Sequence, residues 1–421
     1  MSKHKEQTNL QRLSDNFIAL FILQLINYVL PLFLIPYLIR VLGIEGFGIY
    51  SFILAIIMYG VQMSDYGFEL SATYNISLNR DNKSKIDEIF SSVLMIKFLI
   101  AFAYLVVLTI LVFFIDKLFF YKELIFLSFG IILGHLLFPL WFFQGIEKMR
   151  YIMYLNSFSK LLFFVSIFIF VQKESDLYLL ILLNSISTII IGLTALYVAV
   201  RSFDISLSLQ PWNRLYFYLK EGWFIFTSKF AVEFYTTINI IILGLFASPL
   251  VVGYYAVSVK IIHALGSLLD PLTRTVYPYL VNLYQDSNEH FIQRNKQLSI
   301  IIFIIMFPVS LLVGNFSEQI LEVITGNKVM LLNVEILQIF SLSLMVYLYG
   351  SQFTNMLVTL KETKFLNKIL FLTAGLNTFF APIVVYYLGV KGMVWLSVFF
   401  AFSLTFSKSY YVFIHLKRRK K

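Results

Sequence analysis

The sequence predicts an all-α membrane protein with twelve transmembrane helices in two pseudo-symmetric halves. Hydrophobic residues make up 59% of the 421 positions and charged residues only 13%, against about a quarter in ordinary soluble domains. The apolar residues form runs of about 20, the length at which a helix crosses a ~30 Å hydrocarbon core. Backbone hydrogen bonds must be satisfied inside lipid, so the runs are expected to be helices. The ~10-residue alternating segments of a β-barrel are not found in the sequence.

Polar breaks separate the apolar runs, and each run is expected to be one transmembrane span. The first run follows a polar, basic start without a small-residue cleavage site, so it is expected to remain as a membrane helix. The twelve predicted spans are 14–40, 47–66, 90–115, 123–143, 151–171, 177–200, 223–247, 253–280, 298–315, 333–356, 368–388 and 391–416.

The distribution of basic residues predicts the orientation. Twelve spans place both termini on one side, and the connections on that side hold 21 Lys and Arg residues against 6 on the other. The positive-inside rule therefore puts both termini in the cytoplasm. The net charge of +10 comes from these connections and the tail KRRKK. Such basic segments hold the loops on the cytoplasmic side and contact anionic lipid, and they do not indicate nucleic-acid binding.

A weak internal repeat indicates how the halves are related. The polar connection 206–222 divides the chain into a bundle at 1–205 and a second bundle with a basic tail at 223–421. Because each half holds an even number of spans, the halves enter the membrane in the same sense, as a parallel repeat. A short outer corner recurs in both halves, with Gly48 and Gly253, and Tyr50 and Tyr255, each 205 positions apart. Further along, Asp65 and Asp270 have the same spacing.

Several stretches resemble a known transporter family. They are LPLFLIPYLIRVLGIEGFGIYSF (30–52), DYGFELSATYNISLNR (65–80), KIDEIFSSVLMIK (85–97), WFFQGIEKMRYI (141–152) and, more loosely, KIIHALGSLLDPLTRTVYP (260–278). With these stretches the chain resembles the Wzx-type O-antigen flippases, polysaccharide-biosynthesis transporters of the multidrug/oligosaccharidyl-lipid/polysaccharide superfamily. The likeness covers essentially the whole chain and is densest before residue 155.

The resemblance implies a fold, a cargo and a location. It implies two six-helix bundles around a central cavity, alternating access, and a lipid-linked oligosaccharide as substrate. An undecaprenyl-pyrophosphate-linked repeat unit for O-antigen or another surface polysaccharide would then cross the bacterial inner membrane. The expected partners are this substrate, the bilayer and other polysaccharide-assembly membrane proteins, with no nucleic acid, cofactor or metal.

Basic residues inside the predicted spans are the main candidates for a binding site. An ion at the bilayer centre costs at least ~2.5 kcal/mol, so such residues usually face a cavity, a partner or an interface. One interpretation is that long lysine side chains reach back to the headgroups. The other is a cation-lined vestibule that attracts an acidic headgroup. The proposed vestibule residues are Lys97, Lys160, Lys229, Lys260 and Lys408.

Acidic and polar residues in the spans give a second set of candidates. Glu233 lies one helical turn after Lys229, which allows either a local ion pair or a coupling site whose charge changes during transport. Asp65, Asp270 and Arg274 lie near span ends and suit either structural or gating roles. The first span holds a polar and proline-containing set, expected to bond to neighbouring helices, line a cavity or form a hinge: Gln24, Asn27, Pro31 and Pro36.

Three other functions compete with this interpretation. Enzyme chemistry is disfavoured, because the five histidines are scattered, cysteine is absent and no nucleophile motif or phosphate loop occurs. The enzyme that competes is a membrane glycan polymerase, which is expected to have a large outer loop, whereas the predicted outer connections are short. A cation-coupled multidrug exporter of the same superfamily would place acids at its core, whereas bases outnumber acids in these spans. A flippase for lipid-linked peptidoglycan precursor is a third alternative, disfavoured by the shorter chain.

Overall fold

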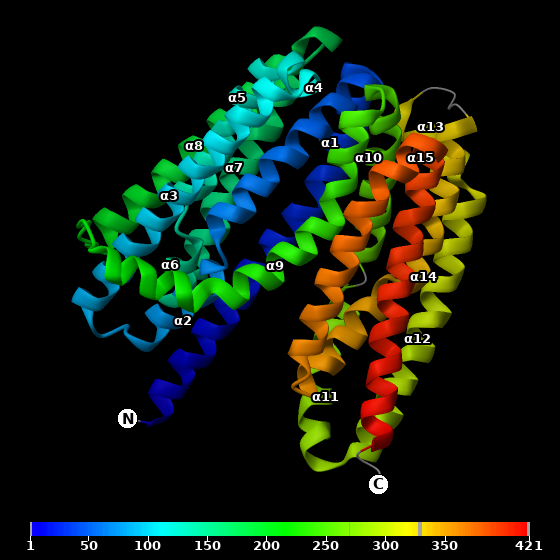
Figure 1. Cartoon of the computed structure of the whole chain (residues 1–421). Coiled ribbons are helices and arrows are strands. Elements are labelled where there is room, and N and C mark those ends of the chain that lie inside the picture. The colour runs from blue at the N-terminus through cyan, green and yellow to red at the C-terminus, as the bar shows by residue number, and fades with distance from the viewer. Residues whose placement is uncertain (1, 269, 327–330, 419–421) are drawn as a thin grey trace. The chain divides into compact units, whose positions relative to one another are not determined.

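The computed structural model describes residues 2–268, 270–326 and 331–418, and within them the fold is helical throughout, with no strand (Figure 1). One 3-10 turn, Glu174–Asp176, precedes α8. The helices are α1 Ser2–Asp65, α2 Phe68–Leu78, α3 Lys83–Phe114, α4 Asp116–Phe120, α5 Lys122–Leu137, α6 Leu140–Gly145, α7 Met149–Phe170, α8 Leu177–Ser202, α9 Trp212–Phe246, α10 Pro249–Leu268, α11 Asp270–Asp286, α12 Asn288–Asn315, α13 Ser317–Thr325, α14 Leu331–Thr359 and α15 Thr363–Arg418.

The helices account for the predicted membrane spans. Among the described residues, nine helices are long and apolar enough to cross a membrane, or ten when the bent pair within α9 is taken as one span. The longest two, α1 and α15, each contain a non-helical glycine with positive φ, Gly43 and Gly389. Each of these helices covers two predicted runs, so every predicted run from 14–40 to 391–416 has a helical counterpart.

Packing divides the chain into two compact units. The first unit holds the residues up to Leu34 together with Phe52–Glu233, and the second holds Ile35–Ser51 and the chain from Phe234 onward. The change of unit after Glu233 lies within α9, beyond the predicted connection 206–222. Residues 204–211 are non-helical, and α9 already begins at Trp212. The predicted bundle boundaries at residues 205 and 223 remain a proposal.

Aromatic packing builds part of the core of the first unit. Trp141 is 1% exposed and packs on Phe90, with ring centroids 5.1 Å apart. Beside them, Arg80 donates to the Gly145 carbonyl at 2.8 Å and forms an ion pair with Glu147. The stretches 65–80 and 141–152, which carry the family resemblance, are therefore in direct contact with one another.

The two repeated corners pack on each other in the second unit. A Cβ atom added at Gly48 would lie 2.0 Å from the Pro249 carbonyl oxygen, and one added at Gly253 would lie 2.2 Å from that of Ile44. Pro249 follows Ile44 by the same 205 positions that separate the glycines, so the contact is reciprocal. Only residues without a side chain allow such close backbone approach. This symmetry supports the predicted parallel repeat.

Candidate functional site

Four charged residues from four different helices meet in the first unit. Lys229 on α9 lies with its Nζ atom 2.6 Å from Glu69 Oε2 on α2. Lys97 on α3 lies 3.7 Å from Asp65 Oδ1, at the end of α1. Gly67, whose φ is +75°, allows the tight turn from α1 into α2, and so places Asp65 and Glu69 on either side of one corner. The result is a charge network with lysines and carboxylates in alternation.

Asp65, Glu69 and Lys97 of this network line a cavity of about 300 Å³ in the first unit. Lys97 is only 4% exposed, and its Nζ also lies 3.5 Å from the His135 carbonyl oxygen on α5. His135 is within electrostatic range of both Lys97 and Lys160. The remaining wall includes polar groups that suit hydroxyl-rich or hydrated ligands: Gln62, Ser64, Asn156, Ser159 and Thr188.

Tyr59 on α1 contacts α9 at Glu233 in the same unit. The Tyr59 hydroxyl donates to the Glu233 backbone carbonyl at 3.4 Å, and its ring packs edge-on against Phe230. The Glu233 carboxylate lies close enough to interact electrostatically with Tyr59. Glu233 and Lys229 both lie on α9, and the structure pairs Lys229 with Glu69, 160 positions away in the chain.

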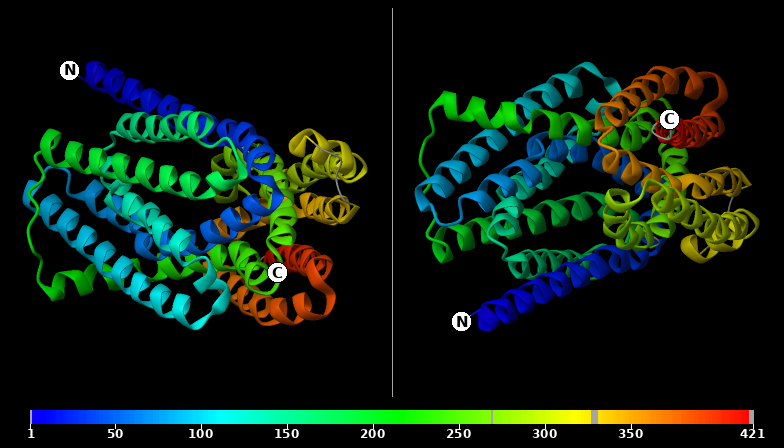
Figure 2. Two further views of the ribbon diagram at one scale, coloured as in Figure 1. Left: turned by 90° about the horizontal axis from the view of Figure 1, so that it is seen from above. Right: turned by 90° about the horizontal axis from the view of Figure 1, so that it is seen from below.

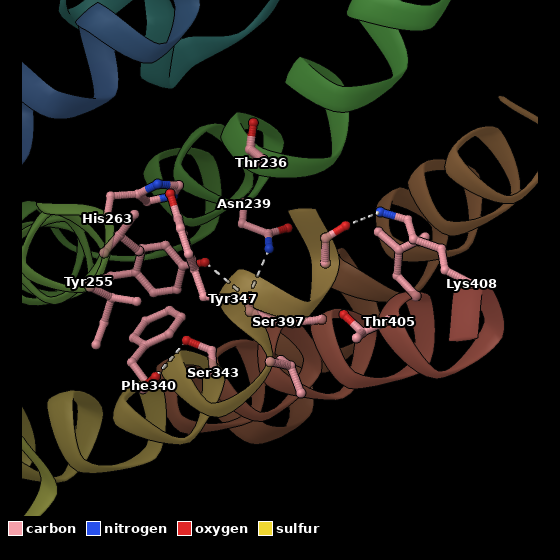
Figure 3. Close-up of a pocket in the computed structure, with 16 residues that line it drawn as sticks. Thr236, Asn239, Tyr255, His263, Phe340, Ser343, Tyr347, Ser397, Thr405 and Lys408 are labelled. Carbon is pink, nitrogen blue, oxygen red and sulfur yellow. Dashed lines mark hydrogen bonds between the residues drawn. The ribbon is translucent and has the colours of Figure 1, made fainter. Parts of the chain in front are cut away.

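The second unit contains its own cavity, of about 220 Å³ (Figure 3). A chain of hydrogen bonds supports one side: Asn377, outside the lining, donates to Asn239 at 2.8 Å, and Asn239 donates to Ser397 at 2.9 Å. The Tyr255 hydroxyl lies 3.0 Å from the same Ser397 oxygen. The rings of Phe340 and Tyr347 complete this mixed polar and aromatic wall.

Lys408 lies at the other end of the second cavity. It is 6% exposed and donates to Thr354 Oγ1 at 3.0 Å, with the Gly350 carbonyl oxygen 3.5 Å away. His263 lies on the opposite side, within electrostatic range of Lys260. No Asp or Glu belongs to the lining of this cavity in the part of the chain that the structure describes. A buried ammonium with neutral ligands attracts an anion more strongly than one that is already paired.

The predicted candidates divide into groups. Lys97, Lys160, Lys229, Asp65 and Glu233 gather in the first unit, Lys408 lines the second cavity and Lys260 lies close to it. Pro36 is half-buried within α1. The other predictions concern side chains that lie outside what the structure describes: Gln24, Asn27, Pro31, Asp270 and Arg274.

Sequence reasoning missed several polar residues of the two cavities. Glu69 lies only four positions after Asp65, but the turn at Gly67 puts the two residues on different helices, so helical spacing gives no signal for their shared site. His135, Asn239, Asn377 and Ser397 are single polar residues within apolar helices. Only the packing of helices distant in sequence brings them to a cavity.

Comparisons with known proteins identify the family. Residues 13–284, more than half of the chain, match the family described as polysaccharide biosynthesis protein. The chain belongs to this family. A putative O-antigen transporter of Escherichia coli (strain K12) is 34% identical over 274 residues, which are 64% of this chain and 65% of the relative. The match thus spans just under two thirds of that relative. A second putative O-antigen transporter, from Shigella dysenteriae, is 28% identical over 91% of this chain and 95% of its own length.

Solved structures share the fold at low sequence identity. The lipid II flippase MurJ in an inward closed conformation has a TM-score of 0.74 at 14% identity, covering 94% of this chain and 87% of its own. An outward-facing multidrug resistance MATE transporter of the MOP superfamily has a TM-score of 0.54 at 15% identity, covering 97% and 95%. These likenesses confirm the predicted fold class of a polytopic all-α membrane protein.

Proposed function

We propose that this family member is a flippase for an undecaprenyl-pyrophosphate-linked oligosaccharide repeat unit. It would move this repeat unit by alternating access across the bacterial inner membrane, for O-antigen or other surface-polysaccharide assembly, with both termini in the cytoplasm. The role is transport rather than catalysis. The relatives named as putative O-antigen transporters support the cargo, and the flippase of similar fold supports the type of movement.

The observation that carries the proposal is the burial of Lys97 and Lys408. Both ammonium groups belong to membrane-crossing helices, line internal cavities and are 4% and 6% exposed. A lysine that only reached back to the headgroups would be largely exposed at its end. A buried cation in a low-dielectric wall can replace part of the hydration that a pyrophosphate loses when it leaves the headgroup zone.

The two cavities suit different tasks. In the second unit the lining of the cavity includes Lys408 and lacks carboxylates among the described residues, which favours binding of an anion. In the first unit Lys97 and Lys229 are paired with Asp65 and Glu69, so their charges are already balanced. We assign anion attraction primarily to Lys408, and conformational coupling to the balanced network.

Replacing the embedded lysines one at a time tests the proposal. We expect alanine at Lys97, Lys160, Lys229, Lys260 or Lys408 to reduce surface-glycan assembly in a strain lacking the gene, most strongly at Lys408, where loss of one charge-assisted contact should cost roughly tenfold. Arginine should restore part of the activity. Lys148→Ala, at an exposed position on a connection, is the matched control. Full complementation by every alanine variant at normal membrane abundance would exclude a cation-lined path.

A second candidate function has one specific observation in its favour. A cation-coupled multidrug exporter needs buried acids, and Asp65 and Glu69 line the cavity of the first unit. The lysine variants separate the two functions, because a cationic drug gains nothing from Lys408. Energised vesicles that export a cationic dye equally well with and without Lys408 would favour the exporter.

A further inference from the structure

The connection between α8 and α9 binds α3 in a regular register. Residues 204–211 are non-helical (the extended segment between the green helices in Figure 2) and contact α3 at every second residue. Their partners on α3 are four positions apart. The four contacts are Asp204 with Lys83 at 2.5 Å, the Ser206 amide with Asp87 at 3.0 Å, the Ser208 amide with Ser91 at 3.1 Å and the Gln210 amide with the Met95 sulfur at 3.3 Å.

This register follows from backbone geometry. Two residues of extended chain advance about 6.6 Å and four residues of α-helix about 6 Å, so the contacts repeat without strain. The Lys83 ammonium that binds Asp204 also holds the pKa of that carboxyl below its usual range. The side chains between the contact positions differ in burial: Ile205 is buried in the core of the first unit, whereas Leu207 is 51% and Leu209 is 90% exposed.

The first turns of α9 continue this exposed apolar surface. Trp212, Tyr216 and Trp223 lie within about 40° of one another around the helix at 100° per residue. All three side chains are more than half exposed, at 65%, 58% and 51%. On the opposite face, Arg214 lies 3.8 Å from Glu88 and Glu221 accepts a hydrogen bond from Asn75 at 2.7 Å. In Figure 1 this part of α9 runs crosswise to α3, α5 and α8 of the same unit.

The exposed surface is continuous with lipid-facing side chains. Gln210 lies at the level of Met95 on α3, and the next turns of this membrane-crossing helix expose Phe98 and Phe102, at 45% and 66%. Trp and Tyr are the residues enriched at membrane interfaces. Two further basic residues suit anionic headgroups: Arg201 at the end of α8 and Lys220 on α9.

We propose that residues 204–224 form a membrane-surface strap, bound to α3 on one side and to the bilayer interface on the other. The contact positions 204, 206, 208 and 210 hold the strap on α3. The apolar side chains of Leu207, Leu209, Trp212, Tyr216 and Trp223 bind the leaflet on the basic side of the protein. This surface role is independent of the transported substrate.

Tryptophan fluorescence tests the lipid contact. The chain has four tryptophans, so a variant with Trp141→Phe, Trp223→Phe and Trp395→Phe reports on Trp212 alone. In vesicles containing anionic phosphatidylglycerol, we expect lipids brominated near the headgroup to quench most of this fluorescence, and aqueous iodide to quench little. The matched control retains only Trp141, which is 1% exposed and should resist both quenchers. Strong quenching of Trp212 by iodide with no effect of brominated lipid would overturn the proposal.

Cysteine cross-linking tests the attachment to α3 on the full chain. Cysteine is absent from the sequence, so a Ser91→Cys, Ser208→Cys pair has no competing thiol. We expect this pair to form a disulfide on mild oxidation in membranes. The control pair Ser91→Cys, Leu209→Cys, whose second side chain points away from α3, should remain reduced. Equal cross-linking of both pairs, or of neither, would contradict the register.

Discussion

Replacing Asp65 by asparagine should destabilise the protein strongly. The Asp65 carboxylate is the ion-pair partner of Lys97, whose side chain is 4% exposed. Removing one member of a buried pair leaves the other charge uncompensated, which typically costs about 3 kcal/mol or more. We expect a lower thermal midpoint for the purified protein in detergent and reduced abundance in the membrane. Asp81→Asn, at an exposed position in the connection before α3, should have little effect on either measurement.

The double variant Asp65→Asn, Lys97→Met separates stability from function. Removal of both charges should recover most of the lost midpoint, because no unpaired ion remains in the wall. Surface-glycan assembly should stay low if the network couples conformational change to transport. A double variant as unstable as Asp65→Asn alone would show that the cost does not come from the unpaired lysine.

Adding a side chain at Gly253 or Gly48 should disrupt the reciprocal corner contact. The new Cβ atom would lie 2.2 Å or 2.0 Å from a backbone oxygen, a distance that backbone cannot relieve by a rotamer change. Overpacking of this kind costs about 1–3 kcal/mol. We expect both Gly253→Ala and Gly48→Ala to lower the thermal midpoint, and valine to lower it further.

Gly375 provides the matched control for the corner glycines. It lies within α15 of the same unit, and a Cβ added there meets nothing within 4 Å. Alanine in a helix is favoured over glycine by up to about 1 kcal/mol, so Gly375→Ala should leave the midpoint unchanged or raise it. If the corner variants match Gly375→Ala, the close contact of the repeated corners contributes nothing to stability.

Sequence reasoning predicted the helices well because burial in lipid imposes a simple pattern. Apolar runs of membrane length can only be helical, so α7 and α8 begin and end close to the predicted edges. The main difference between prediction and structure is the beginning of α9, because Trp212–Gly222 is polar enough to be predicted as a connection. Its helix is anchored to the protein by Glu88 and Asn75, partners more than a hundred positions earlier in the chain.

The candidate site was predictable only in part, for a related reason. A lysine inside a membrane span stands out against its neighbours, so Lys97 and Lys408 could be found without a structure. Their ligands could not, because Thr354 and Gly350 are ordinary helix residues until packing brings α14 against α15. The lysine in the first cavity is paired with a carboxylate, and the lysine in the second cavity is not paired with one among the described residues. This difference likewise depends on contacts between helices that are distant in sequence.

Transport in reconstituted vesicles tests the central claim most directly: buried lysines carry an acidic headgroup across the membrane. The purified protein would be placed in liposomes with a fluorescent glycan joined to undecaprenyl through pyrophosphate, and arrival at the opposite leaflet followed by a membrane-impermeant quencher. We predict movement by the wild-type protein, little movement by Lys408→Ala, and little movement of a matched glycan whose lipid lacks the pyrophosphate. Equal movement of the neutral and pyrophosphate-linked glycans, unaffected by Lys408→Ala, would contradict the claim.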